Sequence, residues 1–166
     1  MKAKIVSLEK AIEVTHSLPT KYAGELHQID TYFIVKKGRL KLREINQTQA
    51  ELIFYDRDER SSQRISNYEV YAVVNALQIK QVLEKALGVL AVVKKKRRVF
   101  LYNETRIHLD EVLHLGYFLE FEVPIDTSID SAKNVTNYLI ERFNISQIDF
   151  ISESYLDLVL RTNQNI

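Results

Sequence analysis

Three cationic side chains, Arg39, Lys41 and Arg43, alternate with leucines in the stretch GRLKLRE. A β-strand points alternate side chains to opposite faces, so a strand here places the cations on one face and the leucines on the other. The leucine face needs a hydrophobic core, whereas the cationic face needs either bulk water or a polar cavity that holds an anion. Guanidinium groups match phosphate oxygens two at a time, so a polyphosphate is an anion that suits this face.

Other segments of strand-like sequence repeat this alternation of charged and apolar residues, and their charges segregate by sign. The charged positions are Lys2 and Lys4; Arg57; Lys95 and Arg97; Arg106, His108 and Asp110; and Glu120 and Glu122. An antiparallel sheet with one solvated face also alternates in this way, so the pattern alone leaves both interpretations open. An enclosed face of unpaired cations is costly, and it becomes sensible if a polyanion neutralises them. Carboxylates two residues apart on one strand face would then hold Mg²⁺ or Mn²⁺.

The bulk composition narrows the class of protein. The 166 residues suffice for one domain, and 23 Lys and Arg against 22 Asp and Glu give no global attraction to nucleic acid or to an acidic membrane. The absence of cysteine excludes disulfides, thiolate zinc sites and cysteine nucleophiles. The first residues lack the apolar core of a signal peptide and no apolar run has the length of a membrane span, so we expect a cytoplasmic chain without a membrane partner. Without a Gly-rich phosphate loop, side chains must bind any phosphate.

Hydrophobic periodicity and capping residues indicate the elements that position these side chains. We predict strands at 2–6, 27–35, 38–44, 50–57, 64–71, 89–100, 106–110 and 116–123. We predict helices at 7–18, 75–88, 131–143 and 154–160, and a loop at 58–63. This order predicts an α+β fold, a single domain over residues 1–166 built on an eight-stranded antiparallel β-barrel or tunnel with helices packed on the outside.

Six short motifs in this order resemble the CYTH superfamily, and most closely its class IV adenylyl cyclase-like branch. They are HQIDTYF at 27–33, GRLKLRE at 38–44, AELIFYDR at 50–57, VxKxR at 93–97, IHLDEV at 107–112 and LGYFLEFE at 115–122. The resemblance implies an eight-stranded antiparallel triphosphate tunnel. It also implies a triphosphate held by inward Lys and Arg side chains, and Mg²⁺ or Mn²⁺ held by inward glutamates.

Carried over by motif, the resemblance implies a site residue by residue. Phosphate contacts are expected from Lys2, Lys4, Arg39, Lys41, Arg43, Arg57, Lys95 and Arg97. Metal ligands are expected at Glu120, Glu122 and Asp110, and catalytic roles at Lys41, Arg43 and Asp110. His108 is a further candidate, although a strand histidine is more often a structural hydrogen-bonding residue. The family's amino-terminal ExExK strand is matched only at Lys2: its two glutamates fall at and before Met1, so either the true start lies upstream or part of the metal site is lost.

The resemblance favours an adenylyl cyclase that converts ATP to cAMP and pyrophosphate. One alternative is a hydrolase of the thiamine triphosphatase or tripolyphosphatase type. Another is a catalytically impaired module that binds a nucleotide or polyphosphate without turnover, because the glutamates are missing. The expected partner is a nucleoside or organic triphosphate or inorganic polyphosphate, with no nucleic acid, and the chain is expected to be a monomer or a homodimer. Nucleic-acid binding through Lys94–Arg98 would need a continuous basic surface.

Overall fold

The computed structural model describes residues 1–56, 67–124 and 129–163. Within these residues the chain forms eight β-strands, four α-helices and one 3-10 helix. In chain order they are β1 (Lys2–Ile5), α1 (Leu8–Ser17), β2 (Thr20–Phe33), β3 (Arg39–Ile45), β4 (Gln49–Asp56), β5 (Asn67–Ala72), α2 (Ala76–Leu87), β6 (Val89–Tyr102), β7 (Thr105–Val112), β8 (Gly116–Glu122), α3 (Ile129–Arg142), η1 (Gln147–Asp149) and α4 (Tyr155–Asn163).

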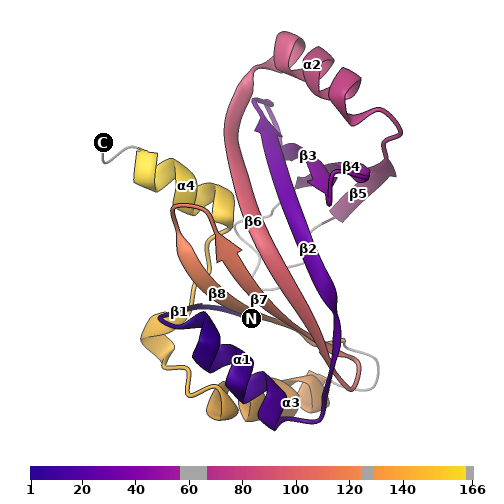
Figure 1. Ribbon diagram of the computed structural model, residues 1–166. Helices are drawn as coiled ribbons and strands as arrows, with labels where there is room; N and C mark the ends of the chain where they lie inside the picture. Colours follow the sequence, from indigo (N-terminus) through magenta and orange to yellow (C-terminus); the bar gives the residue numbers. More distant parts are fainter. Residues whose placement is uncertain (57–66, 125–128, 164–166) are drawn as a thin grey trace. The chain divides into compact units, whose positions relative to one another are not determined.

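The strands join one sheet in the order β1-β8-β7-β6-β2-β3-β4-β5, and the pairs β1–β8, β8–β7, β7–β6, β2–β3, β3–β4 and β4–β5 are antiparallel. The prediction of an eight-stranded antiparallel sheet with helices is therefore confirmed. The chain divides into two compact units, which are described separately below. Unit 1 contains Met1–Leu26 and Lys95–Ser154, and unit 2 contains His27–Lys94 and Tyr155–Ile166. The two longest strands, β2 and β6, each contribute to both units (Figure 1). That residues 1–166 form a single domain stays a prediction.

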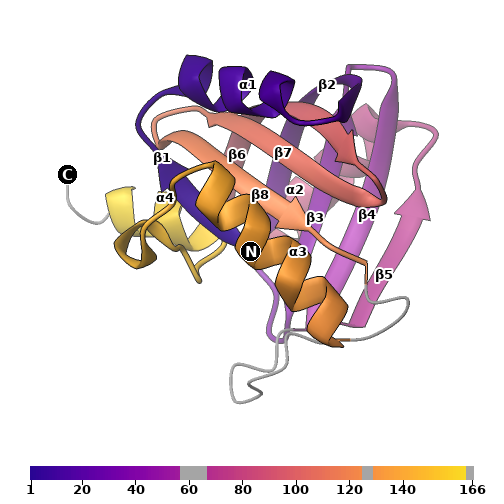
Figure 2. The same cartoon turned by 90° about the horizontal axis from the view of Figure 1, so that it is seen from below.

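Unit 1 buries one face of β7 and β8 under two helices. Figure 2 shows α1 and α3 lying over these strands, and their apolar residues form one core with the sheet. The core residues are Leu8, Ala11, Leu18, Phe100, Ile107, Leu109, Leu119, Phe121, Leu139 and Phe143. The Ser7 hydroxyl accepts a hydrogen bond of 3.2 Å from the backbone N–H of Lys10, and so caps α1 as the sequence predicts. Because alternate residues of β7 and β8 fill this core, Arg106, His108, Asp110, Glu120 and Glu122 lie on the opposite face.

Unit 2 packs α2 against the leucine face of β3. Leu42 is completely buried there together with Phe33 and Ala50, and Leu83 and Leu87 of α2 pack against them. The ends of α2 are those the sequence predicts. The side chain of Asn75 accepts a hydrogen bond from the backbone N–H of Gln78 at 3.1 Å, and Gly88 ends the helix with φ 77°. Burying the leucines of β3 turns Lys41 and its cationic neighbours to the other face of the strand.

Most of the expected element bounds differ from the structure by one to three residues, and the start of β2 differs most. β2 begins at Thr20 rather than at residue 27, because its amino-terminal half pairs in unit 1, where Tyr22 packs against Phe100 at a ring-centroid distance of 5.2 Å. The polar residues and the glycine of this half conceal the strand pattern in the sequence. β6 continues to Tyr102, and β5 covers residues 67–72. The predicted loop at 58–63 and the start of the strand predicted at 64 lie outside the described residues. Among the helices that the structure describes, none has both the length and the apolar character required to cross a membrane.

Candidate functional site

In unit 2, Lys41 is buried and Arg43 is half-buried on the cationic face of β3, and both form ion pairs with Asp30 of β2. Lys41 Nζ donates to Asp30 Oδ2 at 2.8 Å. Arg43 donates from Nε to Oδ1 at 2.7 Å and from Nη2 to Oδ2 at 2.8 Å. The register explains this contact, since Asp30 lies directly opposite Arg43 in the β2–β3 ladder. One buried carboxylate therefore fixes the two cations before any ligand binds.

Two buried tyrosines complete the surroundings of Lys41. Its Nζ lies 5.4 Å from the ring centroid of Tyr32 and 6.0 Å from that of Tyr55, within the range of a cation–π interaction. Nζ also donates to the Tyr32 hydroxyl at 3.5 Å. Burial, and then the charge of Asp30, raise the pKa of Tyr32 far above its ordinary value of 10.0, so this phenol keeps its proton.

The third cation of β3, Arg39, pairs with Asp157 of α4, which belongs to the same unit. Its Nη2 donates to Oδ1 at 2.7 Å and its Nη1 to Oδ2 at 3.2 Å, a bidentate arrangement. Burial alone would lower the pKa of Arg39, but hydrogen bonding to Asp157 and Tyr55 outweighs burial, and the net pKa is raised. Asp157 of α4 therefore orients the guanidinium of Arg39, which is the first cation of the GRLKLRE stretch.

In unit 1, Arg97 of β6 lies between two carboxylates. Its Nε and Nη2 donate to the two oxygens of Asp110, each at 2.7 Å, and Nη2 also donates to Glu120 Oε2 at 2.7 Å. Asp110 has no exposed surface, and Lys95 Nζ lies 3.9 Å from its Oδ2. The basic block from 94 to 98 is divided by the strand alternation: Lys95 and Arg97 are buried, whereas Arg98 pairs with Glu25 at 3.1 Å.

Glu120 stands beside Glu122 and the buried His108 on the charged face of β7 and β8. His108 Nδ1 lies 3.7 Å from Glu120 Oε2 and 3.8 Å from Glu122 Oε1. Burial favours the protonated form of Glu120, but the nearby His108 and the charges of Arg97 and Lys95 outweigh it and hold the pKa of Glu120 well below its usual range. Glu120 is therefore ionised at neutral pH.

This group of three side chains fits a divalent cation. His108, Glu120 and Glu122 each offer one ligand atom, and these atoms lie within 4.8 Å of one another. Carboxylate oxygens and imidazole nitrogens both bind divalent metals. Of the three predicted ligands, the structure brings Glu120 and Glu122 together, whereas both oxygens of Asp110 accept hydrogen bonds from Arg97.

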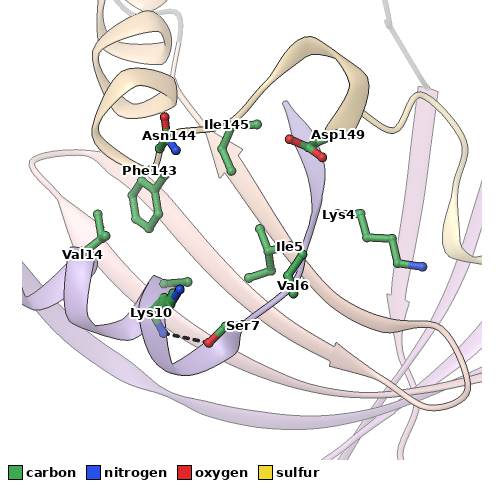
Figure 3. Close-up of a pocket in the computed structure, with 11 residues that line it drawn as sticks. Lys4, Ile5, Val6, Ser7, Lys10, Val14, Phe143, Asn144, Ile145 and Asp149 are labelled. Carbon is green, nitrogen blue, oxygen red and sulfur yellow. Dashed lines mark hydrogen bonds between the residues drawn. The ribbon is translucent and has the colours of Figure 1, made fainter.

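The remaining predicted residues lie elsewhere. Lys2 is opposite Glu120 in the β1–β8 ladder, and its Nζ donates to the carbonyl of Glu153. Lys4 is exposed, and Figure 3 shows it at the edge of a pocket of about 290 Å³ between the start of α1 and the residues that follow α3. Arg57 lies outside the described residues. Phosphate binding by each of these three stays a prediction.

One expectation about the charged face is wrong. The sequence suggested cations that stay unpaired until a polyanion arrives, but Arg39, Lys41, Arg43 and Arg97 all contact carboxylates. Asp30 lies in the strand predicted at 27–35 and Asp157 in the helix predicted at 154–160, but the sequence identifies neither as the partner of a cation. The alternation of Gln28, Asp30 and Tyr32 on one face of β2 is the signal that could have identified Asp30.

Comparison with known proteins gives a family and several structures. The model of the CYTH domain matches residues 2–155. A protein from Pyrococcus horikoshii OT3 is 21% identical over 95% of this chain and 96% of its own, with a TM-score of 0.81. A "putative adenylate cyclase" from Vibrio parahaemolyticus is 20% identical over 96% of this chain and 95% of its own, with a TM-score of 0.75. Another "putative adenylate cyclase", from Bacillus halodurans, is 16% identical over 95% of this chain and 94% of its own, with a TM-score of 0.63. At these identities the likeness establishes the fold alone. No curated protein matches the chain.

Proposed function

The chain belongs to the CYTH family, whose domains bind triphosphates, and we propose that it binds an organic triphosphate with a divalent metal and converts it in the manner of class IV adenylyl cyclases. The observation that carries this proposal is the burial of oriented Lys and Arg side chains on the strand faces that carry the carboxylates. Solvated surface charges would be exposed instead, and their ion pairs would contribute little.

The ion pairs of the cations suit them to bind phosphate. A buried cation without a partner would destabilise the empty protein, and Asp30 and Asp110 prevent this. They also hold Arg43 and Arg97 in fixed orientations, so less side-chain entropy is lost when a phosphate binds. In this proposal Lys41 and Arg43 contact the phosphates as catalytic residues, and Asp110 acts as a positioning residue for Arg97.

The metal belongs to unit 1 in this proposal. Glu120 and Glu122 would hold it, and the bound metal would supply positive charge that stabilises the phosphate oxygens in the transition state. Arg97, which contacts Glu120, adds a fixed positive charge beside the same ligands. In the cyclase reaction the ribose 3′-oxygen bonds to the α-phosphorus, the bond to pyrophosphate breaks, and the hydroxyl proton is released.

The organic part of the substrate has a candidate contact in Tyr68. This residue of β5 is opposite Tyr55 of β4, which is in turn opposite Arg39, so all three share the cationic face. The rings of Tyr55 and Tyr68 stack with centroids 5.2 Å apart and an interplanar angle of 27°, and Tyr68 is 62% exposed. An exposed ring beside phosphate-binding cations supports a planar base as the organic group, because bases stack on aromatic side chains.

Binding of the triphosphate without turnover stays an alternative to the cyclase. Lys2 is opposite Glu120 in the β1–β8 ladder, but its Nζ donates to the carbonyl of Glu153. A hydrolase of the thiamine triphosphatase or tripolyphosphatase type would use the same phosphate contacts as the cyclase. The following properties stay predictions: a cytoplasmic location, a monomeric or homodimeric state, and the lack of nucleic-acid and membrane partners.

A product assay tests the proposal. The full chain is incubated with ATP and either Mg²⁺ or Mn²⁺, and cAMP and pyrophosphate are resolved from ADP and phosphate. We expect cAMP, and we expect its loss in a Lys41→Met variant that still folds. Phosphate without cAMP would reject the cyclase in favour of the hydrolase. Bound nucleotide without any product would favour the binding module, and the absence of binding would reject all three.

A further inference from the structure

We propose that His108 is a metal ligand, so that the metal site of this chain combines one imidazole nitrogen with the carboxylates of Glu120 and Glu122. This inference rests on the metal requirement of the proposed function and deepens it, because it names the class of metal. It also differs from the predicted metal site, whose expected ligands are Glu120, Glu122 and Asp110, with His108 only as a further candidate.

The first observation is that His108 Nδ1 lacks a hydrogen-bond partner. The residue is 4% exposed, and within the described part of the chain no donor or acceptor satisfies this nitrogen. Buried polar atoms of side chains are nearly always hydrogen-bonded, and an exception points to a bound ion as the missing partner. The nitrogen faces the two glutamate carboxylates, which are the groups a metal would share with it.

The second observation is the spacing of the three ligand atoms. The distances of 3.7 Å and 3.8 Å from Nδ1 to the glutamate oxygens are too long for hydrogen bonds. Atoms that bind one small divalent ion at about 2.1 Å lie roughly 3 to 3.5 Å from each other. All three ligand atoms lie within 4.8 Å of one another, so they must move closer together to enclose an ion, and Glu122, whose side chain is 49% exposed, has room to move.

The sheet holds these ligands in place. His108 is directly opposite Glu120 in the β7–β8 ladder, and Glu122 follows two residues later on the same face. Glu120 is oriented by the hydrogen bond of 2.7 Å from Arg97, and Arg97 is in turn oriented by Asp110. Such a chain of outer contacts is how proteins usually fix metal ligands. It gives Asp110 an indirect role at the metal in place of direct ligation.

The charges around the site indicate moderate affinity. Two glutamates face the ion, but Arg97 already contacts Glu120 Oε2, and Arg106 Nη1 lies 3.8 Å from Glu122 Oε2. The imidazole nitrogen would add a third ligand without adding negative charge to the site. Because Mg²⁺ prefers oxygen ligands whereas Mn²⁺ and Co²⁺ also accept imidazole, the site should select Mn²⁺ and Co²⁺ over Mg²⁺.

Metal titration of the full chain without nucleotide tests this assignment. Mn²⁺ binding is followed by electron paramagnetic resonance, Co²⁺ binding by visible absorption, and Mg²⁺ binding by competition with Mn²⁺. We expect wild type to prefer Mn²⁺ over Mg²⁺ by about tenfold or more, and His108→Ala to remove most of this preference by weakening Mn²⁺ binding. The control is His114→Asn, which changes an exposed histidine in the turn after β7 and keeps a residue type that tolerates its φ of 65°.

Two further measurements keep the test decisive if His108→Ala fails to fold. Glu122→Gln alters a half-exposed residue and should weaken both metals, and in wild type Mn²⁺ should broaden the His108 imidazole resonances before those of His114. Equal Mn²⁺ and Mg²⁺ affinities in wild type, or an unchanged preference in folded His108→Ala, would overturn the inference. So would tight tripolyphosphate binding with no metal effect on His108, which would leave the proposed function standing. Mn²⁺ binding that depends on His108, in a chain that binds no triphosphate, would support the inference and reject the function.

Discussion

Asp110 accepts two hydrogen bonds from the guanidinium of Arg97, each 2.7 Å long, at a position with no exposed surface. The pair joins neighbouring strands, since Arg97 and Asp110 are opposite each other in the β6–β7 ladder. In unit 2, Arg43 is opposite Asp30 in the β2–β3 ladder and donates two hydrogen bonds to it, and Lys41 donates a third. Each unit therefore presents cations whose orientation is set by a buried acid, and this arrangement leads to tests that separate stability from binding.

Asp110→Asn should destabilise the protein by about 3 kcal/mol, because Arg97 would stay buried with only Glu120 to balance its charge. The free energy of unfolding is measured in urea at neutral pH. Glu111→Gln, a neighbouring exposed acid on the opposite face of β7, should change it by less than about 0.5 kcal/mol. If both variants are as stable as wild type, the Arg97–Asp110 pair does not support the fold.

Arg43→Ala should weaken tripolyphosphate binding by about tenfold or more and lower the free energy of unfolding by only about 1 kcal/mol. The stability effect is small because Asp30 keeps its contact with Lys41. Binding is measured by calorimetry and stability by thermal unfolding without ligand. A melting temperature that falls sharply while binding of the folded fraction is unchanged would identify Arg43 as a purely structural partner of Asp30.

Tyr32 should make the protein less stable at alkaline pH. In the unfolded chain its phenol loses its proton near pH 10, whereas burial and Asp30 raise the pKa of Tyr32 in the folded state. Above pH 10 the unfolded state thus binds fewer protons, and the free energy of unfolding falls by up to about 1.4 kcal/mol per pH unit. The free energy of unfolding is measured in urea at about pH 9 and pH 11. Between these pH values it should fall less for Tyr32→Phe than for wild type. Equal losses would mean that Tyr32 ionises normally.

Tyr68→Ala should weaken ATP binding by about tenfold and leave tripolyphosphate binding unchanged, because only the nucleotide carries a base that can stack. Tyr68→Phe keeps the ring and should bind both ligands as wild type does. Titration of each ligand into the three proteins gives the comparison. A parallel loss of both ligands in Tyr68→Ala would show that Tyr68 supports the sheet edge and does not recognise the base.

The sequence predicts the local elements well where capping and alternation agree. Ser7, Asn75 and Gly88 mark helix ends that the structure contains, and the alternation of β3 correctly separates its leucine and cationic faces. The family motifs then lead to the fold. The amino-terminal half of β2 could not be predicted, since its strand conformation depends on pairing in unit 1 and its own pattern is weak.

The sequence predicts which charged residues belong to the candidate site, but it does not predict which of them pair with one another. Alternation identifies Arg97, Asp110 and Glu120 as charged-face residues, but whether an acid binds a metal or an arginine depends on strand register, which separate motifs do not give. Asp157 is a stronger example, because its contact with Arg39 joins residues 118 positions apart. His108 appears in the sequence as one charged-face residue among several, and its unsatisfied nitrogen appears only in the structure.

Calorimetric titration of tripolyphosphate into the full chain, at about 0.15 M salt so that weak surface attraction is screened, tests the central claim most directly. The buried cations predict a Kd of about micromolar order, weakened about tenfold or more in Arg43→Ala of unit 2 and separately in Lys95→Met of unit 1. If folded wild type shows no binding at millimolar tripolyphosphate, or if all three proteins bind with equal affinity, the claim that the paired cations of each unit bind phosphate is contradicted.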